Sequence, residues 1–392
     1  MSGRGNGVGV VDAAVVGYLA LQGGKTVAAL RAARRAPDAV EPSPVELGRV
    51  VVVQPILSGD PGLEDALRDN LLSLAGARFV WLVDDDDAEG RRVAGKLAAE
   101  AARSAPSAAA GLRIEVRLCP PAPDGVNPKL VKLQPALDDC RDDEVLLVLD
   151  DDTRLPRTSL GALLAGLEGA TLATGLPSYL PGSTPWARLV EQFVDNNAAL
   201  TYLPIAPVTI NGMTWAMRVE DLRALGGFEA ILRNLTDDLA VARLVLESGG
   251  TICQTASPQW ITTAVGSAGA YARVMHRWML FAHLLLRRQP PATVAKIGLL
   301  LGTHPGLLWV GLAGSVRARR PWPLVVLLGG RFGLIQLVQR RIYGRSLQRP
   351  VLSLVSELVQ PLHVVHGSVQ RTIRWRTRTY RVVSDDDFSP VR

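Results

Sequence analysis

The chain has little cysteine. Its 392 residues include only Cys119, Cys140 and Cys253, which are too few and too scattered for a disulfide framework or a zinc site. A chain without disulfides is typical of a reducing compartment, which we expect here. At this length the chain can bury a full core, and we expect one catalytic domain with an appendage.

Two common nucleotide-binding motifs are absent. The sequence contains neither a GxGxxG turn nor a GxxxxGK[ST] loop. The first motif brings a backbone close to a dinucleotide, and the second wraps the phosphates of a nucleoside triphosphate. Neither kind of site is therefore expected.

Acidic residues are almost missing from the last part of the chain. Between Arg273 and Arg381 the single acid is Glu357, whereas arginine is frequent. A basic surface alone is typical of nucleic-acid binding. Here the basic stretch is also the most apolar one, which favours a membrane surface that carries anionic lipid. We expect a membrane partner and no nucleic acid.

The apolar segments leave several membrane arrangements open. Gly7–Leu21 is shorter than the roughly 20 residues that cross a bilayer, so it is either an interfacial anchor or a disordered start. Residues 295–316 and 322–338 have spanning length, although Arg331 interrupts the second. Residues 351–369 read as an amphipathic helix on the membrane. The alternative for this whole region is a buried helical subdomain of a soluble protein.

Two spans would conflict with the usual distribution of charge. They would place Arg317, Arg319 and Arg320 on the side opposite the catalytic domain, against the positive-inside rule. A re-entrant or interfacial hairpin, with Arg331 buried against protein or reaching the interface, is therefore an equal alternative.

From residue 49 onward, strand patterns alternate with helix patterns. We expect strands at 50–53, 79–83, 114–118 and 145–149. Three helices are expected between them: the first ends at Leu74, the second covers 91–103 and the third covers 130–140. This order predicts a parallel sheet with crossover helices, the nucleotide-binding half of an open α/β sheet. Strands at 172–175 and 210–217, separated by a helix at 188–202, are expected to follow.

The most informative segment is EVLLVLDDDTRL, residues 144–155. An apolar run of strand length ends in Asp150, Asp151 and Asp152. Ligands of α/β sheets bind at the carboxyl ends of the strands, and carboxylates there can hold a divalent cation that grips a diphosphate. A solvated turn is the alternative. Acids also follow an apolar run at residues 79–87, and the pair Asp237 and Asp238 opens a predicted helix, where capping is the alternative.

The order of the polar motifs resembles a known family. These motifs are Asp85, NPK at Asn127–Lys129, Asp150-x-Asp152, LxxLGGF ending at Phe228, TDD at Thr236–Asp238, and Arg277 with Trp278. Over residues 49–290 they resemble the inverting family 2 type glycosyltransferases, especially the ceramide glucosyltransferase branch and its bacterial relatives. A weaker similarity covers WRTRTY at residues 375–380.

The resemblance implies residues that bind the donor. Asp85 would contact the nucleoside of a UDP-sugar, while its three aspartate neighbours would be solvated. Lys129 would approach the nucleotide or its phosphates as a point charge. Asp150 and Asp152 would face the sugar diphosphate and bind Mg²⁺ or Mn²⁺, with Asp152 in direct contact. The cation would stabilise the leaving UDP.

The resemblance also implies a catalytic base and an acceptor wall. Asp238 would accept the proton of the acceptor hydroxyl group while its oxygen attacks the anomeric carbon, which inverts the configuration. Arg277 and Trp278 would supply a cation for the diphosphate and an aromatic wall for the acceptor. The family pattern is (Q/R)xxRW, and Val274 departs from it at the first position. A juxtamembrane arginine beside an interfacial tryptophan is the alternative.

Together these inferences predict an α/β protein with a GT-A-like open sheet followed by membrane-associated helices. The expected division is an N-terminal helix and linker at 1–48, a catalytic domain at 49–290 and a basic, apolar helical region with a tail at 291–392. The reaction that the resemblance implies transfers glucose from a UDP-sugar to the hydroxyl group of a membrane lipid such as ceramide or diacylglycerol. We expect the catalytic domain on the cytoplasmic side of the membrane.

Two other functions compete with this one. A strand followed by Asp150-x-Asp152 is also the nucleophile signature of haloacid-dehalogenase phosphotransferases, but that family has Thr or Val where this chain has Arg154. A non-enzymatic basic membrane-binding protein is the third possibility. It would leave the acidic strand ends without a role.

Overall fold

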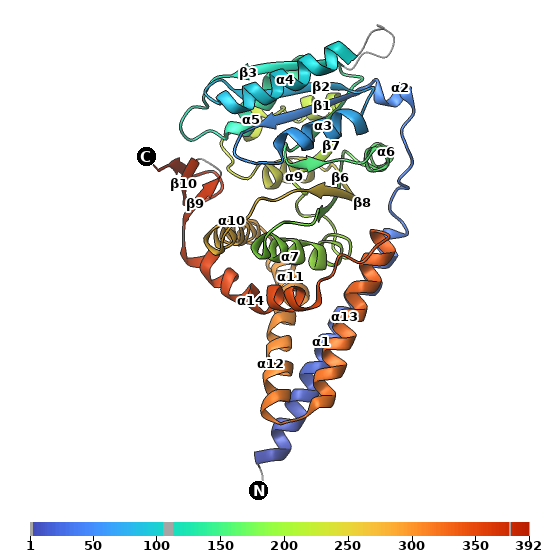
Figure 1. Ribbon diagram of the computed structural model, residues 1–392, viewed down its shortest axis with the longest axis vertical. Helices are drawn as coiled ribbons and strands as arrows, with labels where there is room; N and C mark the ends of the chain where they lie inside the picture. Colours follow the sequence, from blue (N-terminus) through green and yellow to red (C-terminus); the bar gives the residue numbers. More distant parts are fainter. Residues whose placement is uncertain (1–2, 105–112, 376–377, 392) are drawn as a thin grey trace. The chain divides into compact units, whose positions relative to one another are not determined.

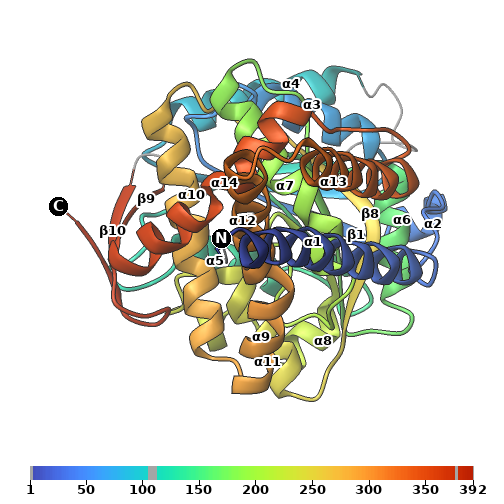
Figure 2. The ribbon, with the colours of Figure 1, turned by 90° about the horizontal axis from the view of Figure 1, so that it is seen from below.

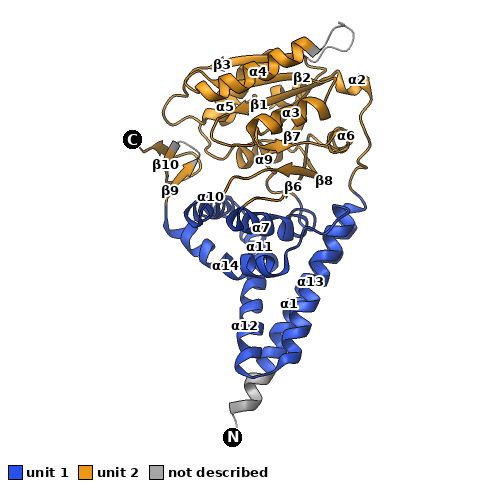
Figure 3. Ribbon diagram, viewed as in Figure 1, with its two compact units in different colours: residues 1–35, 184–206, 266–370 blue, residues 36–183, 207–265, 371–392 orange. Residues whose placement is uncertain are grey.

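The computed structural model describes residues 3–104, 113–375 and 378–391. These residues form two compact units, each built from three separate stretches of the chain (Figure 3). Unit 1 comprises residues 1–35, 184–206 and 266–370, and unit 2 comprises residues 36–183, 207–265 and 371–392. The boundaries expected after residues 48 and 290 remain predictions.

Unit 2 contains an eight-stranded mixed sheet in the order β3-β2-β1-β4-β7-β6-β8-β5 (Figure 1). The strands β1 to β4 form its parallel half, and β7 runs antiparallel to both β4 and β6. The strands are β1 (Val50–Ile56), β2 (Arg78–Asp84), β3 (Arg113–Cys119), β4 (Val145–Leu149), β5 (Thr153–Arg154), β6 (Leu172–Tyr179), β7 (Thr214–Arg218) and β8 (Ile252–Ile261).

Helices cover both faces of this sheet. They are α2 (Pro44–Leu47), α3 (Leu63–Ser73), α4 (Ala88–Ser104), α5 (Pro128–Asp138), α6 (Arg157–Gly166), α8 (Val219–Ala224), the 3₁₀ turn η1 (Glu229–Ile231) and α9 (Asp237–Glu247). Side chains of α5, α8 and α9 share one hydrophobic cluster with Val51 and Val53 of β1. Side chains of α3, α4 and α6 share another with Val50 and Val52. Because β1 is buried on both faces, its first four residues, Val50–Val53, form a continuous apolar run.

Most of the expected strands are present, but one begins later than expected and several others were not predicted. The four strands of the nucleotide-binding half and their crossover helices are confirmed. The strand expected at 210–217 begins only at Thr214, because the residues before it form a bend and turn. The strand β8 was not predicted, since polar residues and Pro258 interrupt its apolar pattern.

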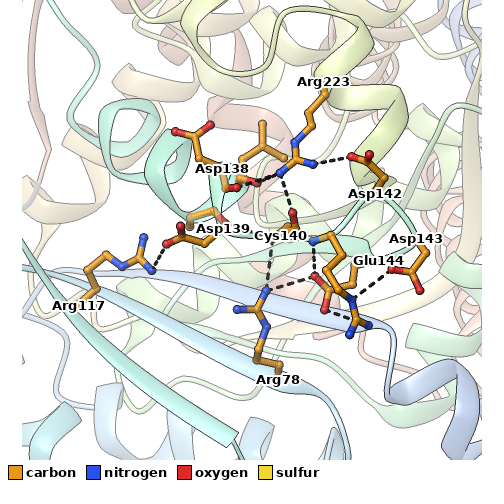
Figure 4. A network of polar contacts seen from close by, with 12 residues as sticks. Arg78, Arg117, Asp138, Asp139, Cys140, Asp142, Asp143, Glu144 and Arg223 are labelled. Carbon is orange, nitrogen blue, oxygen red and sulfur yellow. Dashed lines mark hydrogen bonds and ion pairs between the residues drawn. The ribbon is translucent and has the colours of Figure 1, made fainter.

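The amino-terminal ends of the parallel strands are held by an arginine network (Figure 4). Arg223 donates hydrogen bonds to three backbone carbonyl groups in and just after the last turn of α5, those of Leu137, Asp138 and Cys140. Arg78, which begins β2, pairs with Glu144 just before β4 at 3.3 Å. An arginine that satisfies the free carbonyls at a helix end stabilises that end. The contacts of Arg78 and Arg223 therefore stabilise the fold, and they lie away from the carboxyl ends of the strands, where ligands of α/β sheets bind.

A small antiparallel sheet completes unit 2. It consists of β9 (Thr372–Trp375), β10 (Arg378–Val382) and β11 (Phe388–Pro390), in the order β11-β10-β9. Within the expected similarity at 375–380, residues 376 and 377 lie outside the described residues. The loop between β10 and β11 carries Asp385, Asp386 and Asp387.

Unit 1 is helical. Its helices are α1 (Gly3–Ala33), α7 (Pro185–Tyr202), α10 (Ala268–Arg287), α11 (Pro291–Ile297), the π-helical segment η2 (Gly298–Gly302), α12 (Thr303–Arg317), α13 (Pro321–Ile342) and α14 (Pro350–Val369). The helix α1 packs against α12 and α13 (Figure 2). The helix expected at 351–369 is confirmed as α14.

In the part of the chain that the structure describes, three helical segments are long and apolar enough to cross a membrane: Gly9–Ala33, Pro291–Arg317 and Pro321–Ile342. The expectation that the N-terminal apolar segment is too short to span was wrong. The helix continues through Gln22, Lys25 and Thr26, whose side chains are buried rather than exposed. Arg320, between α12 and α13, pairs with Asp12 of α1 at 3.0 Å.

A buried polar network joins the helices α1, α13 and α14 of unit 1. The Glu357 carboxylate on α14 accepts hydrogen bonds from Tyr18 Oη of α1 at 3.0 Å and from Arg331 Nε of α13 at 2.7 Å. Arg331 is only 3% exposed, so it is buried against protein. An arginine in an apolar helix needs such a partner, because an unpaired charge in hydrocarbon is costly.

Candidate active site

The three aspartates after β4 have different environments. Asp151 is 4% exposed and its Oδ2 accepts a hydrogen bond from the Leu57 backbone N–H at 2.8 Å, which ties the turn to the end of β1. Asp150 and Asp152 are only partly buried. The Asp150 carboxylate accepts from Lys129, and Asp152 Oδ1 accepts from the Thr153 hydroxyl group at 3.1 Å. Asp150 and Asp152 therefore remain the two carboxylates of this turn that a ligand can reach.

Lys129 joins the turn after β4 to the first turn of α9. Asn127 and Pro128 begin α5, since the Asn127 side chain accepts hydrogen bonds from the backbone of Lys129 and the next residue. From the first turn of α5, Lys129 Nζ lies 2.8 Å from Asp150 Oδ1, 2.7 Å from Asp237 Oδ2 and 3.2 Å from the Gly212 carbonyl oxygen. All three N–H groups of the ammonium thus have acceptors.

The charge of Lys129 is held in place by this arrangement. Burial by itself lowers the pKa of Lys129, but the charges of Asp150 and Asp237 outweigh it and raise that pKa above its ordinary value. Lys129 is therefore a permanent cation between two acidic segments. The expectation that it acts as a point charge toward phosphates remains a prediction.

Asp238 lies in the first turn of α9, beside Asp237. It is partly buried, and its Oδ1 accepts a hydrogen bond from the Leu239 backbone N–H at 2.9 Å. Burial, followed by the charge of Asp237, raises the pKa of Asp238 to about 7. A carboxylate with such a pKa can accept a proton near neutral pH.

The absence of a side chain at Gly212 leaves room for the side chain of Asp238. A Cβ atom on Gly212 would lie 2.9 Å from Asp238 Cβ, closer than real Cβ contacts allow, and 3.3 Å from its Cγ, which is a tight contact. The Gly212 carbonyl oxygen also accepts from Lys129. Gly212 therefore belongs to the site through its backbone and through the absence of a side chain.

The second acidic cluster is less solvated than expected. Asp84 is buried and pairs with Lys132 at 2.8 Å. Asp87 is also buried, and its carboxylate accepts from the backbone N–H groups of Ser58 and Gly90. The expectation that these two aspartates are solvated was wrong, because both satisfy buried donors around the end of β2.

Asp85, by contrast, is exposed. Its backbone N–H donates to the Cys119 carbonyl oxygen at 2.9 Å, which joins the ends of β2 and β3. Its side chain thus stands at the carboxyl edge of the sheet, as a nucleoside contact requires. That role remains a prediction.

Arg277 and Trp278 belong to unit 1. Both are partly buried on α10, and the Trp278 ring lies 6.0 Å from the Phe193 ring of α7, centroid to centroid. Unit 2 holds Asp85, Lys129, Asp150, Asp152 and Asp238. The structure therefore brings these five into one unit, and the part that Arg277 and Trp278 play in donor or acceptor binding remains a prediction.

The sequence did not predict the pairing of Asp237 with Lys129. It also missed the role of Asn127, whose Nδ2 donates to the backbone oxygens of Asn234 and Leu235 at 2.9 and 2.8 Å. The dipeptide Asn-Pro before an apolar stretch is a recognisable signal for a helix start. Contacts across more than a hundred residues have no comparable local signal.

The chemistry of Asp150 and Asp152 fits a hard divalent cation. Within the described residues, no group of three or more His, Cys, Asp or Glu side chains forms a complete metal site. Mg²⁺ in nucleotide enzymes commonly uses one or two carboxylates and takes its other ligands from substrate phosphates and water. Two reachable carboxylates one residue apart satisfy that requirement.

Several solved structures are similar to this chain, among them the following three. The mannosyltransferase PcManGT from Pyrobaculum calidifontis, in complex with GDP-Man and Mn²⁺, is 17% identical, with 92% of this chain and 98% of that chain covered and a TM-score of 0.48. TarS 1–349 from S. aureus with UDP-GlcNAc is 11% identical, with 87% and 99% covered and a TM-score of 0.37. Glucosyl-3-phosphoglycerate synthase from Mycobacterium tuberculosis is 15% identical, with 60% and 81% covered and a TM-score of 0.32. We infer no substrate from similarities of this size.

The family comparison is more informative. No curated protein matches the sequence, but the family model for glycosyl transferase family 21 matches residues 13–387. Unit 2 accordingly has the expected GT-A-like open sheet, with the parallel half β3-β2-β1-β4 continued by a mixed half. The phosphotransferase and the non-enzymatic alternatives are thereby wrong. The match spans nearly the whole chain, which therefore belongs to glycosyl transferase family 21.

Proposed function

We propose that this glycosyltransferase moves glucose from UDP-glucose to the hydroxyl group of a membrane lipid such as ceramide or diacylglycerol, with inversion at the anomeric carbon. The observation that carries the proposal is the Asp238 carboxylate, partly buried and with a pKa of about 7, in the same unit as Asp150 and Asp152. Asp238 has the proton affinity of a general base. Asp150 and Asp152 can bind the divalent cation that holds a sugar diphosphate. We place the chain in the branch of ceramide glucosyltransferases and their bacterial relatives.

The reaction is a single displacement. Asp238 accepts the proton of the acceptor hydroxyl group, the acceptor oxygen forms a bond to the anomeric carbon, and the bond from that carbon to the UDP oxygen breaks. The leaving UDP takes the electron pair. Since attack and departure occur on opposite faces of the sugar, the configuration inverts.

The UDP-sugar donor is bound mainly through aspartates and a divalent cation. We assign Asp85 to the nucleoside, Asp150 and Asp152 to Mg²⁺ or Mn²⁺, and Arg277 and Trp278 to the diphosphate and the acceptor. A bound cation stabilises the negative charge of the departing UDP. Lys129 adds a fixed positive charge next to Asp150, and the 2.8 Å contact keeps this carboxylate oriented.

A lipid acceptor and a membrane location are supported by the three apolar helical segments. The chain leaves the first of them through Arg31, Arg34 and Arg35 before it enters unit 2 at residue 36. Arg340 and Arg341 at the end of α13 add to the basic residues at span ends. Such residues favour the cytoplasmic side. They outnumber Arg317, Arg319 and Arg320, which lie at the opposite ends of α12 and α13, and we propose that unit 2 acts on the cytoplasmic side.

The proposal is tested with full-length protein in lipid vesicles that contain ceramide or diacylglycerol. We expect UDP release from UDP-glucose that requires Mn²⁺ or Mg²⁺ and an acceptor lipid, and a β-linked glucolipid by mass spectrometry and NMR. Parallel reactions with UDP-galactose and UDP-N-acetylglucosamine test the choice of sugar. An α-linked product would contradict the inverting mechanism, and transfer only to a water-soluble acceptor would contradict the lipid substrate.

A further inference from the structure

The C-terminal tail reaches the segment that carries the catalytic base. We propose that Asp385, in the loop between β10 and β11, is a positioning residue that fixes residues 234–236 and through them Asp238. The inference rests on the proposed function of Asp238 as the base. It concerns a residue 147 positions further along the chain than the base it serves.

Asp385 uses both carboxylate oxygens and its own carbonyl oxygen on this segment. Its Oδ1 accepts from the Thr236 backbone N–H at 2.9 Å and from the Thr236 hydroxyl group. Its Oδ2 accepts from Asn234 Nδ2 at 2.8 Å. Its backbone carbonyl oxygen accepts from the Leu235 N–H at 2.7 Å. Three consecutive residues are thus bound by one residue of the tail.

These contacts are buried. Asp385, Asn234 and Thr236 are 3%, 6% and 1% exposed. A buried carboxylate loses its hydration, so it is stable only where donors replace the water. Here the donors belong to the backbone and side chains directly before α9, and the buried charge therefore ties the tail to this stretch of chain.

The same stretch is also bound by Asn127, which lies at the start of α5 and more than a hundred residues earlier in the sequence. Its Nδ2 group donates to the carbonyl oxygens of Asn234 and Leu235, while Asp385 accepts from the N–H groups of Leu235 and Thr236. The carbonyl and N–H groups of this short segment are thus bound from two parts of the chain.

The contact between Thr236 and Asp385 replaces the usual side-chain cap at the start of α9. Thr236 is the N-cap residue of α9, yet its side chain does not bond to the N–H groups of that helix. Its hydroxyl group donates to Asp385 instead. The start of α9 is therefore set by the tail rather than by the usual local cap. Asp237 and Asp238 follow directly, so a shift of this segment would move both carboxylates.

The contact between Asn234 and Asp385 offers a reciprocal test. In Asp385→Asn the new amide N–H₂ would face the Asn234 N–H₂, and in Asn234→Asp two carboxylates would face each other. In the double variant Asn234→Asp with Asp385→Asn, the donor and the acceptor have simply changed places and the net charge is that of the wild type. The amide introduced by Asp385→Asn keeps one oxygen for Thr236.

The expected result follows from the geometry. Because a displacement of about 1 Å can cost on the order of 100-fold in rate, we expect each single variant to lower kcat for UDP release about 10- to 100-fold. The KM for UDP-glucose and the affinity for UDP should stay within about twofold, since the proposed donor residues are untouched. The double variant should recover to within about threefold of wild type, a coupling that a double-mutant cycle measures. Asp387→Asn, an exposed aspartate of the same loop, is the matched control and should leave kcat unchanged.

Thermal unfolding of each variant separates position from folding. A merely structural role would lower the midpoint and the folded fraction without a separate loss of kcat per folded molecule. The inference is overturned if kcat of Asp385→Asn per folded molecule stays within about threefold of wild type, or if the double variant is no better than the single ones. Asp238→Asn, measured alongside, tests the proposed function itself: if it keeps full turnover, Asp238 is not the base, whatever Asp385 does.

Discussion

Lys129 Nζ lies 2.7 Å from Asp237 Oδ2, in the first turn of α9. An acid in the first turn of a helix is usually explained by the helix dipole. Here the side chains of Lys129 and Asp237 are both only 11% exposed, and Lys129 contacts Asp150 as well. The segment with the proposed base and the segment with the proposed metal ligands are therefore linked through one ammonium group.

We predict that Lys129→Met impairs both stability and donor binding. It leaves two carboxylates without their cation, and the loss of one partner from a buried ion pair costs about 3–5 kcal/mol. Asp237→Asn should be milder, because Asp150 still pairs with Lys129. Denaturant unfolding and UDP titration of both variants check this order. An equal or greater loss in Asp237→Asn would contradict it.

Asp152→Asn should abolish Mn²⁺-dependent turnover and leave the fold intact, because its carboxylate is partly exposed and is assigned to the cation. Asp151→Asn should keep most activity and lose some stability, since the buried Asp151 side chain accepts from the Leu57 N–H. Turnover at increasing Mn²⁺ concentration and thermal unfolding distinguish the two roles. Near-normal activity of Asp152→Asn would remove it from the metal site.

Gly212→Ala should lower kcat about 10- to 100-fold through the displacement of Asp238. The added Cβ would lie 2.9 Å from Asp238 Cβ, so one of the two must move. The control is Gly95→Ala in α4, where an added Cβ meets nothing within 4 Å. This control should be more stable than wild type by about 0.5–1 kcal/mol with unchanged turnover. Unchanged kcat in Gly212→Ala would show that Asp238 tolerates the shift or has no part in turnover.

The raised pKa of Asp238 predicts a pH dependence. Below about 7 the carboxyl group is protonated and cannot accept a proton, so kcat/KM should rise as the pH increases through about 7. Because folding favours the protonated form, the stability from this group is present at low pH and is lost as the pH rises from about 4 through about 7. Asp238→Asn should therefore lose less stability than wild type over this range. A kcat/KM profile that is flat between pH 5 and 8 would contradict the assignment.

The central strands β1 and β4 of the catalytic sheet could be predicted because they are buried on both faces. Val50–Val53 and Val145–Leu149 have no polar residues to interrupt the pattern, and acids follow where the latter strand ends. The strand β8 has polar residues and Pro258, so its pairing with β6 depends on tertiary context. The N-terminal helix was underestimated for a similar reason. Its polar residues Gln22 and Lys25 are buried against other helices, which a local reading of hydropathy does not detect.

The site was predictable where its residues act through their own chemistry. Asp150, Asp152 and Asp238 stand in recognisable local patterns. Asp237 and Asp385 were not predictable, because their roles depend on contacts with Lys129 and Thr236, which are far away in the sequence. Because Asp385 lies in the C-terminal tail, a truncation that removes membrane-associated helices also affects unit 2. A chain that ends near residue 287 loses β9 to β11 and Asp385 together with two of the three apolar helical segments, Pro291–Arg317 and Pro321–Ile342.

The most direct measurement compares Asp238→Asn with wild type in full-length protein, by the rate of UDP release and by UDP titration in the presence of Mn²⁺. A general base contributes typically 10²- to 10⁴-fold to rate, so turnover should fall by about that factor. UDP affinity should stay within a few fold, because the nucleotide is assigned to Asp85 and the cation. Retained turnover, or loss of UDP binding in Asp238→Asn, would contradict the account.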